Sequence, residues 1–455
     1  MLAVSIALVV TSCAAPERTE HGDAADVAAA RNVILVSLDT LRADRLSCYG
    51  YPVLTSPTLD RLAREGVRFT NAVATSPWTL PSHASLLTGL YPHRHGATGP
   101  TRGIPDEIPV LAEALAKSGF ATAGFVSSSF LAPKRGLDRG FETYRVLSEW
   151  GRRETGETFL RNPGTDVTDA ALAWLHTHAD ERFFLFLHYY DAHADYAPPA
   201  RHRAGIVGPY DGPASGTNKQ LLAVRRGQMS YQAEDVVHVA SLYDAEIRAV
   251  DAELARVIDF LDAAELTGST LVVVTSDHGE EFLERGSVLH GRTYYQEVIS
   301  IPLVLRGPGV PAAHSVDAPV SLVDVAPTVL ARTGVDARMP FQGTDLAPLW
   351  VAGQTLENRH VMAEADWQNS VPGMFRMVRD GRYKLIHEWR TGRSELYDLR
   401  EDPGETKDLS RIEPRRHAAL LAALADLMTA GPAEGVPSAV SPDEIERMRV
   451  LGYLD

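Results

Sequence analysis

The sequence predicts an α/β protein with a mostly parallel sheet flanked by helices, followed by a small C-terminal antiparallel sheet subdomain. Apolar runs without alternation, at 32–39, 182–190 and 272–274, are typical of strands buried on both faces. Amphipathic helical patterns separate these runs, which is the order that builds a parallel sheet. From about residue 355 the pattern changes to short strands joined by Asp-Gly and Thr-Gly turns, which favours hairpins.

The individual elements follow from periodicity and from their start and stop residues. Gly66, Gly89 and Gly119 each follow a helical pattern and predict its end. We expect helices at 58–65, 80–88, 111–118, 168–178, 243–261, 321–330 and 415–427, and strands at 67–74, 121–127, 301–306, 361–364, 375–380 and 383–388. The segment 201–232 has weak periodicity and is predicted to be a long surface loop.

Composition limits the classes of function. A chain of 455 residues with 45% hydrophobic residues can bury one large core and a smaller one. The 44 basic and 59 acidic residues give a net charge of −15, which argues against a general nucleic-acid or anionic-membrane binder.

The first residues have the pattern of an export signal. Residues 2–10 are apolar but too few to span a bilayer, and T-S-C-A-A follows them. Because V-T-S-C resembles the bacterial lipobox, we expect residues 1–13 to be a signal peptide and Cys13 to carry lipid. Residues 14–30 would form a tether, and the protein would be exported to the periplasm or cell envelope with a lipid anchor. Cys48 would then remain without a disulfide partner, as a structural residue.

The stretch from Thr79 to Gly89 concentrates reactive residues at the start of a short apolar helix. Pro81 suits the first turn, and Thr79 is predicted to be the N-cap. A hydroxyl there lies beside unpaired backbone N–H groups and the positive end of the helix dipole, which favour an alkoxide or a bound oxyanion. Threonine is also a common cap without any chemistry.

This stretch, T-L-P-S-H-A-S-L-L-T-G, resembles the signature C/S-x-P-x-R-x-x-x-L-T-G of the sulfatase family in the alkaline phosphatase superfamily. Further motifs of that family follow in the same order: H-Y-Y-D-A-H-A-D-Y-A-P at 188–198, S-D-H-G at 276–279, H-G-R at 290–292 and E-L-Y-D-L-R-E-D-P-G-E at 395–405. The resemblance implies an alkaline phosphatase-like fold and ester hydrolysis. It divides the chain into a catalytic domain at 31–355, an α+β subdomain at 356–430 and a tail at 431–455.

Several positions depart from the family pattern. Thr79 occupies the position of the Cys or Ser that becomes formylglycine, and His83 replaces the supporting Arg. Because threonine cannot be oxidised to an aldehyde hydrate, Thr79 would act unmodified, as in the Thr-nucleophile phosphodiesterases and phosphoryl-group transferases of the superfamily. Thr40 replaces the second residue of the family's Asp-Asp pair, and the family's G-K-W-H-L-G is missing.

The resemblance implies one divalent cation bound by Asp39, Thr79, Asp277 and His278. An imidazole among oxygen ligands favours zinc or manganese, with calcium or magnesium as alternatives. A second metal, bound by Asp191, His193 and His290, is a competing use of the same region.

Catalytic roles follow by the same resemblance. His290 or His193 would protonate the leaving alkoxide, since a histidine with a pKa near neutrality suits a general acid. His83, His193 and Arg292 would bind the ester oxygens, whereas His188 lies in an apolar run and is interpreted as a packed residue.

The sequence therefore predicts an exported metal-dependent hydrolase that cleaves a phosphomonoester or phosphodiester through Thr79. Its substrate would be a small-molecule, glycan or lipid-headgroup ester, and nucleic acid is not an expected partner. The alternatives are a sulfuric ester hydrolase with an atypical nucleophile, a phosphoryl-group transferase, and a non-catalytic anion-binding lipoprotein.

Overall fold

The structure is a computed structural model that describes residues 29–152, 158–161, 164–350, 359–365, 375–429, 435–438 and 440–450. The predicted signal peptide at 1–13 and nearly all of the tether at 14–30 lie outside these residues. Across the described ranges, no helix combines the length and the apolar character needed to cross a membrane.

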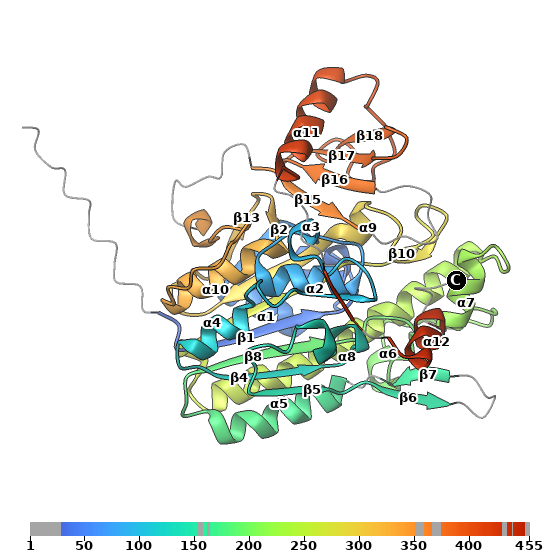
Figure 1. Ribbon diagram of the computed structural model, residues 1–455. Helices are drawn as coiled ribbons and strands as arrows, with labels where there is room; N and C mark the ends of the chain where they lie inside the picture. Colours follow the sequence, from blue (N-terminus) through green and yellow to red (C-terminus); the bar gives the residue numbers. More distant parts are fainter. Residues whose placement is uncertain are drawn as a thin grey trace, which may run out of the picture.

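The main sheet is built around five parallel strands (Figure 1). In spatial order they are β9 (Thr270–Thr275), β1 (Asn32–Leu38), β8 (Phe183–Tyr189), β4 (Ala121–Val126) and β5 (Thr143–Val146). Beyond β9, strand β12 (Ser300–Arg306) pairs antiparallel with both β9 and β2 (Val67–Val73). Two short strands, β13 (His314–Val316) and β14 (Val320–Ser321), pair in parallel with β2. The predicted mostly parallel sheet is confirmed.

Helices cover both faces of this sheet. Val33 and Leu35 of β1 pack into one hydrophobic core, whereas Ile34 and Val36 pack into the other. The first core includes α2 (Thr79–Thr88), α4 (Leu111–Lys117) and α10 (Val325–Thr333), and the second includes α1 (Pro57–Glu65), α5 (Gly164–His178) and α8 (Ala233–Ala263). Because both faces of each central strand are buried, the strands are largely apolar.

Shorter elements connect these layers. They are α3 (Pro92–His95), α6 (Ala200–Arg203), α7 (Asn218–Arg225), α9 (Gln296–Ile299), β3 (Arg102–Gly103), β6 (Glu149–Arg152), β7 (Thr158–Arg161), β10 (Glu281–Phe282) and β11 (Val288–Leu289), with 3-10 turns η1 (Ala43–Arg45), η2 (Ser47–Tyr49), η3 (Ser129–Leu131), η4 (Pro133–Arg135), η5 (Thr267–Ser269), η6 (Leu322–Asp324) and η7 (Ala347–Trp350).

Three local predictions were wrong at their boundaries or in type. The segment 201–232 contains part of α6 and all of α7 rather than being a loop throughout, because Leu221 and Leu222 pack into the second core. Helix α8 begins ten residues before the predicted start, at Ala233, after a capping box at Gln232. Thr79 is the first residue of α2, and Trp78 is its N-cap.

The C-terminal subdomain is an antiparallel sheet of β15 (Val361–Glu364), β16 (Phe375–Arg379), β17 (Tyr383–Glu388) and β18 (Ser394–Asp398). Helix α11 (Pro414–Leu427) lies beside this sheet (Figure 1), and its Leu420 and Leu424 belong to the same hydrophobic cluster as the strands. The tail then returns to the main domain, where β19 (Val436–Pro437) pairs with β3, and its last described element is helix α12 (Pro442–Val450).

Candidate metal centre and active site

Asp39 and Asp277 meet because they follow neighbouring parallel strands at equivalent positions. Ser37 of β1 is paired with Thr275 of β9, and each carboxylate comes two residues later. The carboxyl ends of parallel strands form one edge of the sheet, where ligand sites of α/β proteins lie. There, Asp39, Asp277 and His278 are all buried and can each offer a ligand atom within 4.8 Å of the others.

The hydrogen bonds around these three residues leave one lone-pair atom of each without a partner. Asp39 Oδ2 lies 3.2 Å from His188 Nε2, whereas its Oδ1 has no hydrogen bond. Asp277 Oδ1 accepts from the backbone N–H groups of Thr40 and His278, whereas its Oδ2 is unpaired.

His278 presents a nitrogen suited to a cation. Its Nδ1 lies 3.0 Å from the Gly279 carbonyl and must donate to it, so Nε2 carries a lone pair. That Nε2 is unpaired and lies 3.3 Å from Asp277 Oδ2. Two lone pairs that face each other in a buried site are stable only with a cation or proton between them. The donor set therefore fits a divalent metal.

The charges of the two carboxylates reinforce this conclusion. Burial, together with Asp277 and Glu280, holds the pKa of Asp39 well above its usual range. Burial acts in the same direction on Asp277, but His278 and His83 outweigh it and lower the pKa of that carboxyl. Without a cation, Asp39 therefore resists ionisation while Asp277 remains charged.

Thr79 lies fully buried at the start of α2, and its Oγ1 has no hydrogen-bond partner. His83, one turn later, connects this helix to the carboxylates. Its Nδ1 lies 2.8 Å from the Thr79 carbonyl and 3.6 Å from Asp277 Oδ2, and its Nε2 lies 2.9 Å from Ser37 Oγ. Both ring nitrogens face protein atoms, so His83 connects α2 to β1 and to Asp277 in this structure. Its contact with an ester oxygen stays a prediction.

Glu280 fixes the orientation of His290. Its Oε1 lies 3.0 Å from His290 Nδ1, and its Oε2 accepts from the Tyr196 hydroxyl at 3.0 Å. The His290 ring centroid is 4.3 Å from that of His278 and 4.9 Å from that of His193. The structure therefore brings His290 and His193 to the metal cluster, next to each other.

The near-neutral pKa predicted for these histidines is wrong for the free protein. Burial, then the neighbouring His278 and Arg225, hold the pKa of His290 well below its usual value. Burial and His290 lower the pKa of His193 to about 3. Both rings are therefore neutral near pH 7, and an anionic substrate would be needed to raise the pKa of either one.

The predicted second metal set is not gathered. Asp191 Oδ1 accepts from Gly164 N at 2.9 Å, and His193 Nδ1 donates to the Ala194 carbonyl at 2.8 Å. Throughout the described part of the chain, only Asp39, Asp277 and His278 form a group of three such ligands. Burial raises the pKa of Asp191 to about 7, which also weakens it as a metal ligand.

Arg292 lies half-buried in the turn after His290. Within the described ranges it forms no ion pair, so its charge remains available to an anion.

Ser37, His188 and Glu280 belong to the site, although the sequence argument did not assign them to it. His188 is buried as predicted, but Ser127 N donates to its Nδ1 at 3.4 Å, so its Nε2–H faces Asp39. A signal did exist, because Ser37 and His188 are paired residues near the ends of adjacent strands. Glu280 directly follows the S-D-H-G motif.

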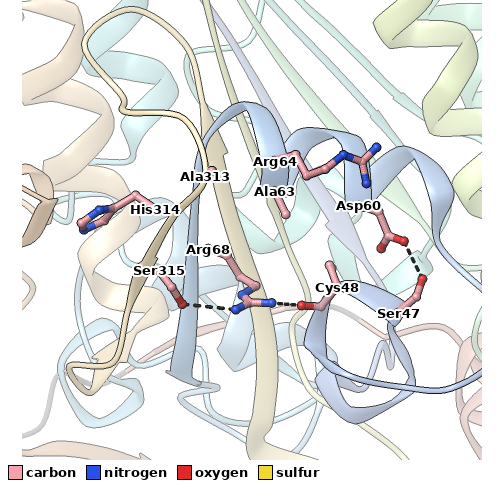
Figure 2. A pocket seen from close by; sticks show the side chains of 9 residues that line it. All are labelled: Ser47, Cys48, Asp60, Ala63, Arg64, Arg68, Ala313, His314 and Ser315. Atoms are coloured by element: carbon pink, nitrogen blue, oxygen red, sulfur yellow. Dashed lines mark hydrogen bonds between the residues drawn. The ribbon is translucent and has the colours of Figure 1, made fainter.

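A separate pocket has a volume of about 310 Å³, and none of the predicted site residues lines it. Figure 2 shows the side chains around it. Its walls are Ser47, Cys48, Asp60, Ala63, Arg64, Arg68, Ala313, His314 and Ser315. Arg68 donates to the Cys48 carbonyl and to Ser315 Oγ, and Ser47 Oγ donates to Asp60 at 2.7 Å. Burial and Asp60 raise the pKa of the Cys48 thiol to about 12, which agrees with the predicted structural role.

The chain matches known families and relatives over most of its length. A family model described as Sulfatase matches residues 31–335, and one described as N-sulphoglucosamine sulphohydrolase, C-terminal, matches residues 287–430. A Delta 4,5-hexuronate-2-O-sulfatase of Bacteroides thetaiotaomicron is 25% identical over 432 residues, covering 86% of each chain. An N-acetylglucosamine-6-O-sulfatase of the same organism is 24% identical over 502 residues, covering 89% of this chain and 85% of the relative.

Solved structures share the fold. A protein in complex with its substrate D-glucosamine-2-N,6-O-disulfate superposes with a TM-score of 0.73 at 22% identity, covering 88% of this chain and 97% of that one. The phosphonate monoester hydrolase of Agrobacterium radiobacter superposes with a TM-score of 0.72 at 21% identity, covering 89% and 100%. The alkaline phosphatase-like architecture is therefore confirmed.

Proposed function

Since the chain belongs to the sulfatase family, whose members hydrolyse ester bonds, we propose that it cleaves a phosphomonoester or phosphodiester with Thr79 as the nucleophile. One observation carries this proposal. Thr79 is the first residue of α2, and its hydroxyl is unpaired. His83, on the same helix, connects the Thr79 carbonyl to the unpaired carboxylate oxygen of Asp277. A threonine at this position offers an alkoxide and cannot offer the hydrated aldehyde of formylglycine.

Asp39, Asp277, His278 and Thr79 would hold one divalent cation, zinc or manganese by their mixed oxygen and nitrogen donors. When bound, the cation lowers the pKa of a coordinated hydroxyl and offsets charge on the ester. The Thr79 hydroxyl releases its proton to solvent, and its oxygen forms the new bond to phosphorus while the bond between phosphorus and the leaving oxygen breaks. Water then attacks the phosphothreonine, releases the product and restores the hydroxyl.

Once the bound anionic ester has raised the pKa of His290 and the ring has taken up a second proton, His290 donates a proton to the leaving alkoxide, while Glu280 keeps the ring oriented through Nδ1. Arg292, free of ion pairs among the described residues, binds a remaining ester oxygen. His193, stacked on Tyr190 with 4.2 Å between the ring centroids, lies beside His290 and contacts the same substrate group. General acid catalysis of this kind contributes roughly 10²- to 10⁴-fold to the rate.

A glycan or lipid-headgroup ester is the proposed substrate class. Curated relatives are named as sulfatases of hexuronate and N-acetylglucosamine, and structural neighbours include phosphonate monoester hydrolases. These names also favour a second candidate function, hydrolysis of a sulfuric ester through an unmodified Thr79.

An assay with matched substrates distinguishes the two functions. Purified protein reconstituted with zinc or manganese is given 4-nitrophenyl phosphate, bis(4-nitrophenyl) phosphate and 4-nitrophenyl sulfate. We expect one of the phosphoesters to be consumed fastest. Faster turnover of the sulfate than of both phosphoesters would replace the first function by the second, and phosphate transfer to an added alcohol would indicate a transferase.

Export with a lipid anchor is a separate part of the proposal, and it rests on the apolar residues 2–10 and Cys13. Cys13→Ser should move the protein from the membrane fraction to the soluble fraction. Cys48→Ser is the matched control and should leave fractionation unchanged. An unchanged Cys13→Ser fractionation, with no lipid mass on the wild-type residue, would contradict lipidation.

A further inference from the structure

The segment from Arg285 to Gln296 carries two residues of the proposed machinery, His290 and Arg292. It runs between β10 and α9 and contains little regular structure apart from the short β11. A loop of this kind needs contacts from outside to hold a catalytic side chain in one position. The C-terminal subdomain supplies such contacts at both ends of the segment.

Arg285 holds the front end of the 285–296 segment, which is its N-terminal end. Its guanidinium donates to the Gly404 carbonyl at 2.7 Å and to the Glu405 carbonyl at 3.1 Å. It also lies over the Tyr295 ring, 4.1 Å from the centroid, which connects the front end of the segment to its rear end.

An ion pair between Lys384 of β17 and Glu405 holds the rear end of the segment, at Gln296. Both side chains are fully buried. Glu405 Oε2 accepts from Gln296 N at 2.8 Å, and Lys384 Nζ donates to Gln296 Oε1 at 3.3 Å. Glu405 therefore contacts both ends of the segment. Its backbone carbonyl accepts from Arg285 at the front end, and its carboxylate oxygen Oε2 lies 3.6 Å from Arg285 Nη2 and accepts from Gln296 N at the rear end.

Helix α9 transmits this restraint to the metal-binding strand end. The Val298 and Glu297 carbonyls accept from the backbone N–H groups of Gly279 and Glu280, at 2.6 and 3.0 Å. A Cβ at Gly279 would lie only 2.1 Å from the Glu297 carbonyl oxygen, so the two backbones are in closest contact here. A shift of α9 would therefore move Glu280, which orients His290.

We propose that Lys384 and Glu405 are positioning residues, whose buried ion pair fixes the 285–296 segment so that His290 and Arg292 lie at the metal site. The C-terminal motif that ends in Glu405 is then part of the catalytic machinery as well as of the fold. This inference rests on the proposed function only where it gives His290 the role of general acid.

Two variants remove the restraint. Glu405→Gln removes one charge, and Lys384→Met together with Glu405→Gln removes both members of the ion pair, so that Lys384 is not left buried without its partner. Arg285 keeps a second carboxylate partner in both variants, because its Nε lies 3.2 Å from Glu297 Oε1. Glu401→Gln makes the same chemical change at an exposed position of the same loop and is the matched control.

The first measurement is amide hydrogen exchange, which requires no activity. In both variants, exchange within 285–296 should accelerate at least about tenfold relative to Glu401→Gln, while β1 and β9 remain protected. Unchanged exchange in 285–296, or equal acceleration throughout the main sheet, would overturn the proposal.

The second measurement compares alkyl with aryl leaving groups, using the ester class that the wild type consumes. In both variants, the loss of kcat should be about tenfold larger for the alkyl ester than for the aryl ester. His290→Ala should show a difference of the same sign. Equal losses for both esters would overturn positioning of His290. If His290→Ala itself shows no such difference, the general-acid role fails instead, and hydrogen exchange alone decides whether the ion pair holds the segment.

Discussion

Replacing Thr79 by alanine should abolish turnover while the protein stays folded. The substitution removes the proposed nucleophile, and its hydroxyl makes no hydrogen bond whose loss could unfold the chain. We expect kcat to fall by at least about 10³-fold, the scale on which removal of a nucleophile acts. Steady-state kinetics with the preferred ester, together with thermal unfolding of the variant, measures both parts of this expectation.

Thr88→Ala is the matched control, because Thr88 is an equally buried threonine at the other end of α2. Its hydroxyl donates to the Ala84 carbonyl at 2.6 Å, so its removal should cost stability but little activity. Thr79→Ser should keep part of the activity, since either hydroxyl can be activated. Mass spectrometry of wild-type protein quenched in acid during turnover should find phosphate on Thr79. Normal turnover by Thr79→Ala would exclude covalent catalysis at this residue.

The arrangement of the main sheet was predictable because a strand buried on both faces has a nearly continuous run of apolar residues. The apolar run of β1 predicted a buried parallel strand. Because Asp39 directly follows that strand, the rule that ligands lie at the carboxyl ends of strands placed it in the site. Helix boundaries were less predictable. The N-cap of α2 was predicted at Thr79 and lies one residue earlier, at Trp78. Trp78 has extended backbone angles, whereas Thr79 already belongs to the helix.

The supporting residues of the site were not predictable in the same way, because their roles depend on tertiary contacts. His83 has the residue type of an anion ligand, yet Ser37 and the Thr79 carbonyl occupy its two nitrogens. His188 has the sequence context of a core residue, yet it contacts Asp39. The pKa of His290 depends on burial among other histidines, which a linear pattern cannot show.

Replacing Asp39 by asparagine should abolish activity and yet stabilise the metal-free protein at neutral pH. Burial, Asp277 and Glu280 raise the pKa of Asp39 above its value of about 3.9 in an unfolded chain. The folded state therefore binds the proton more tightly than the unfolded state. Its stability should be greatest below that unfolded pKa and should be lost as pH rises through the folded pKa. Asparagine has no charge to bury, so this loss should disappear.

The metal should stabilise the wild type much more than Asp39→Asn. Zinc or manganese at about 100 times its dissociation constant should stabilise the wild type by about 2.7 kcal/mol, whereas the variant should gain little. Unfolding in urea from pH 4 to 8, with and without metal, measures both effects. Asp251→Asn is the control for the metal response, because that buried carboxylate accepts from the backbone N–H groups of Thr58 and Leu59 and lies in no group of three possible metal ligands among the described residues. Equal stabilisation of wild type and Asp39→Asn by the ion would contradict Asp39 as a ligand, whatever the activity of the variant.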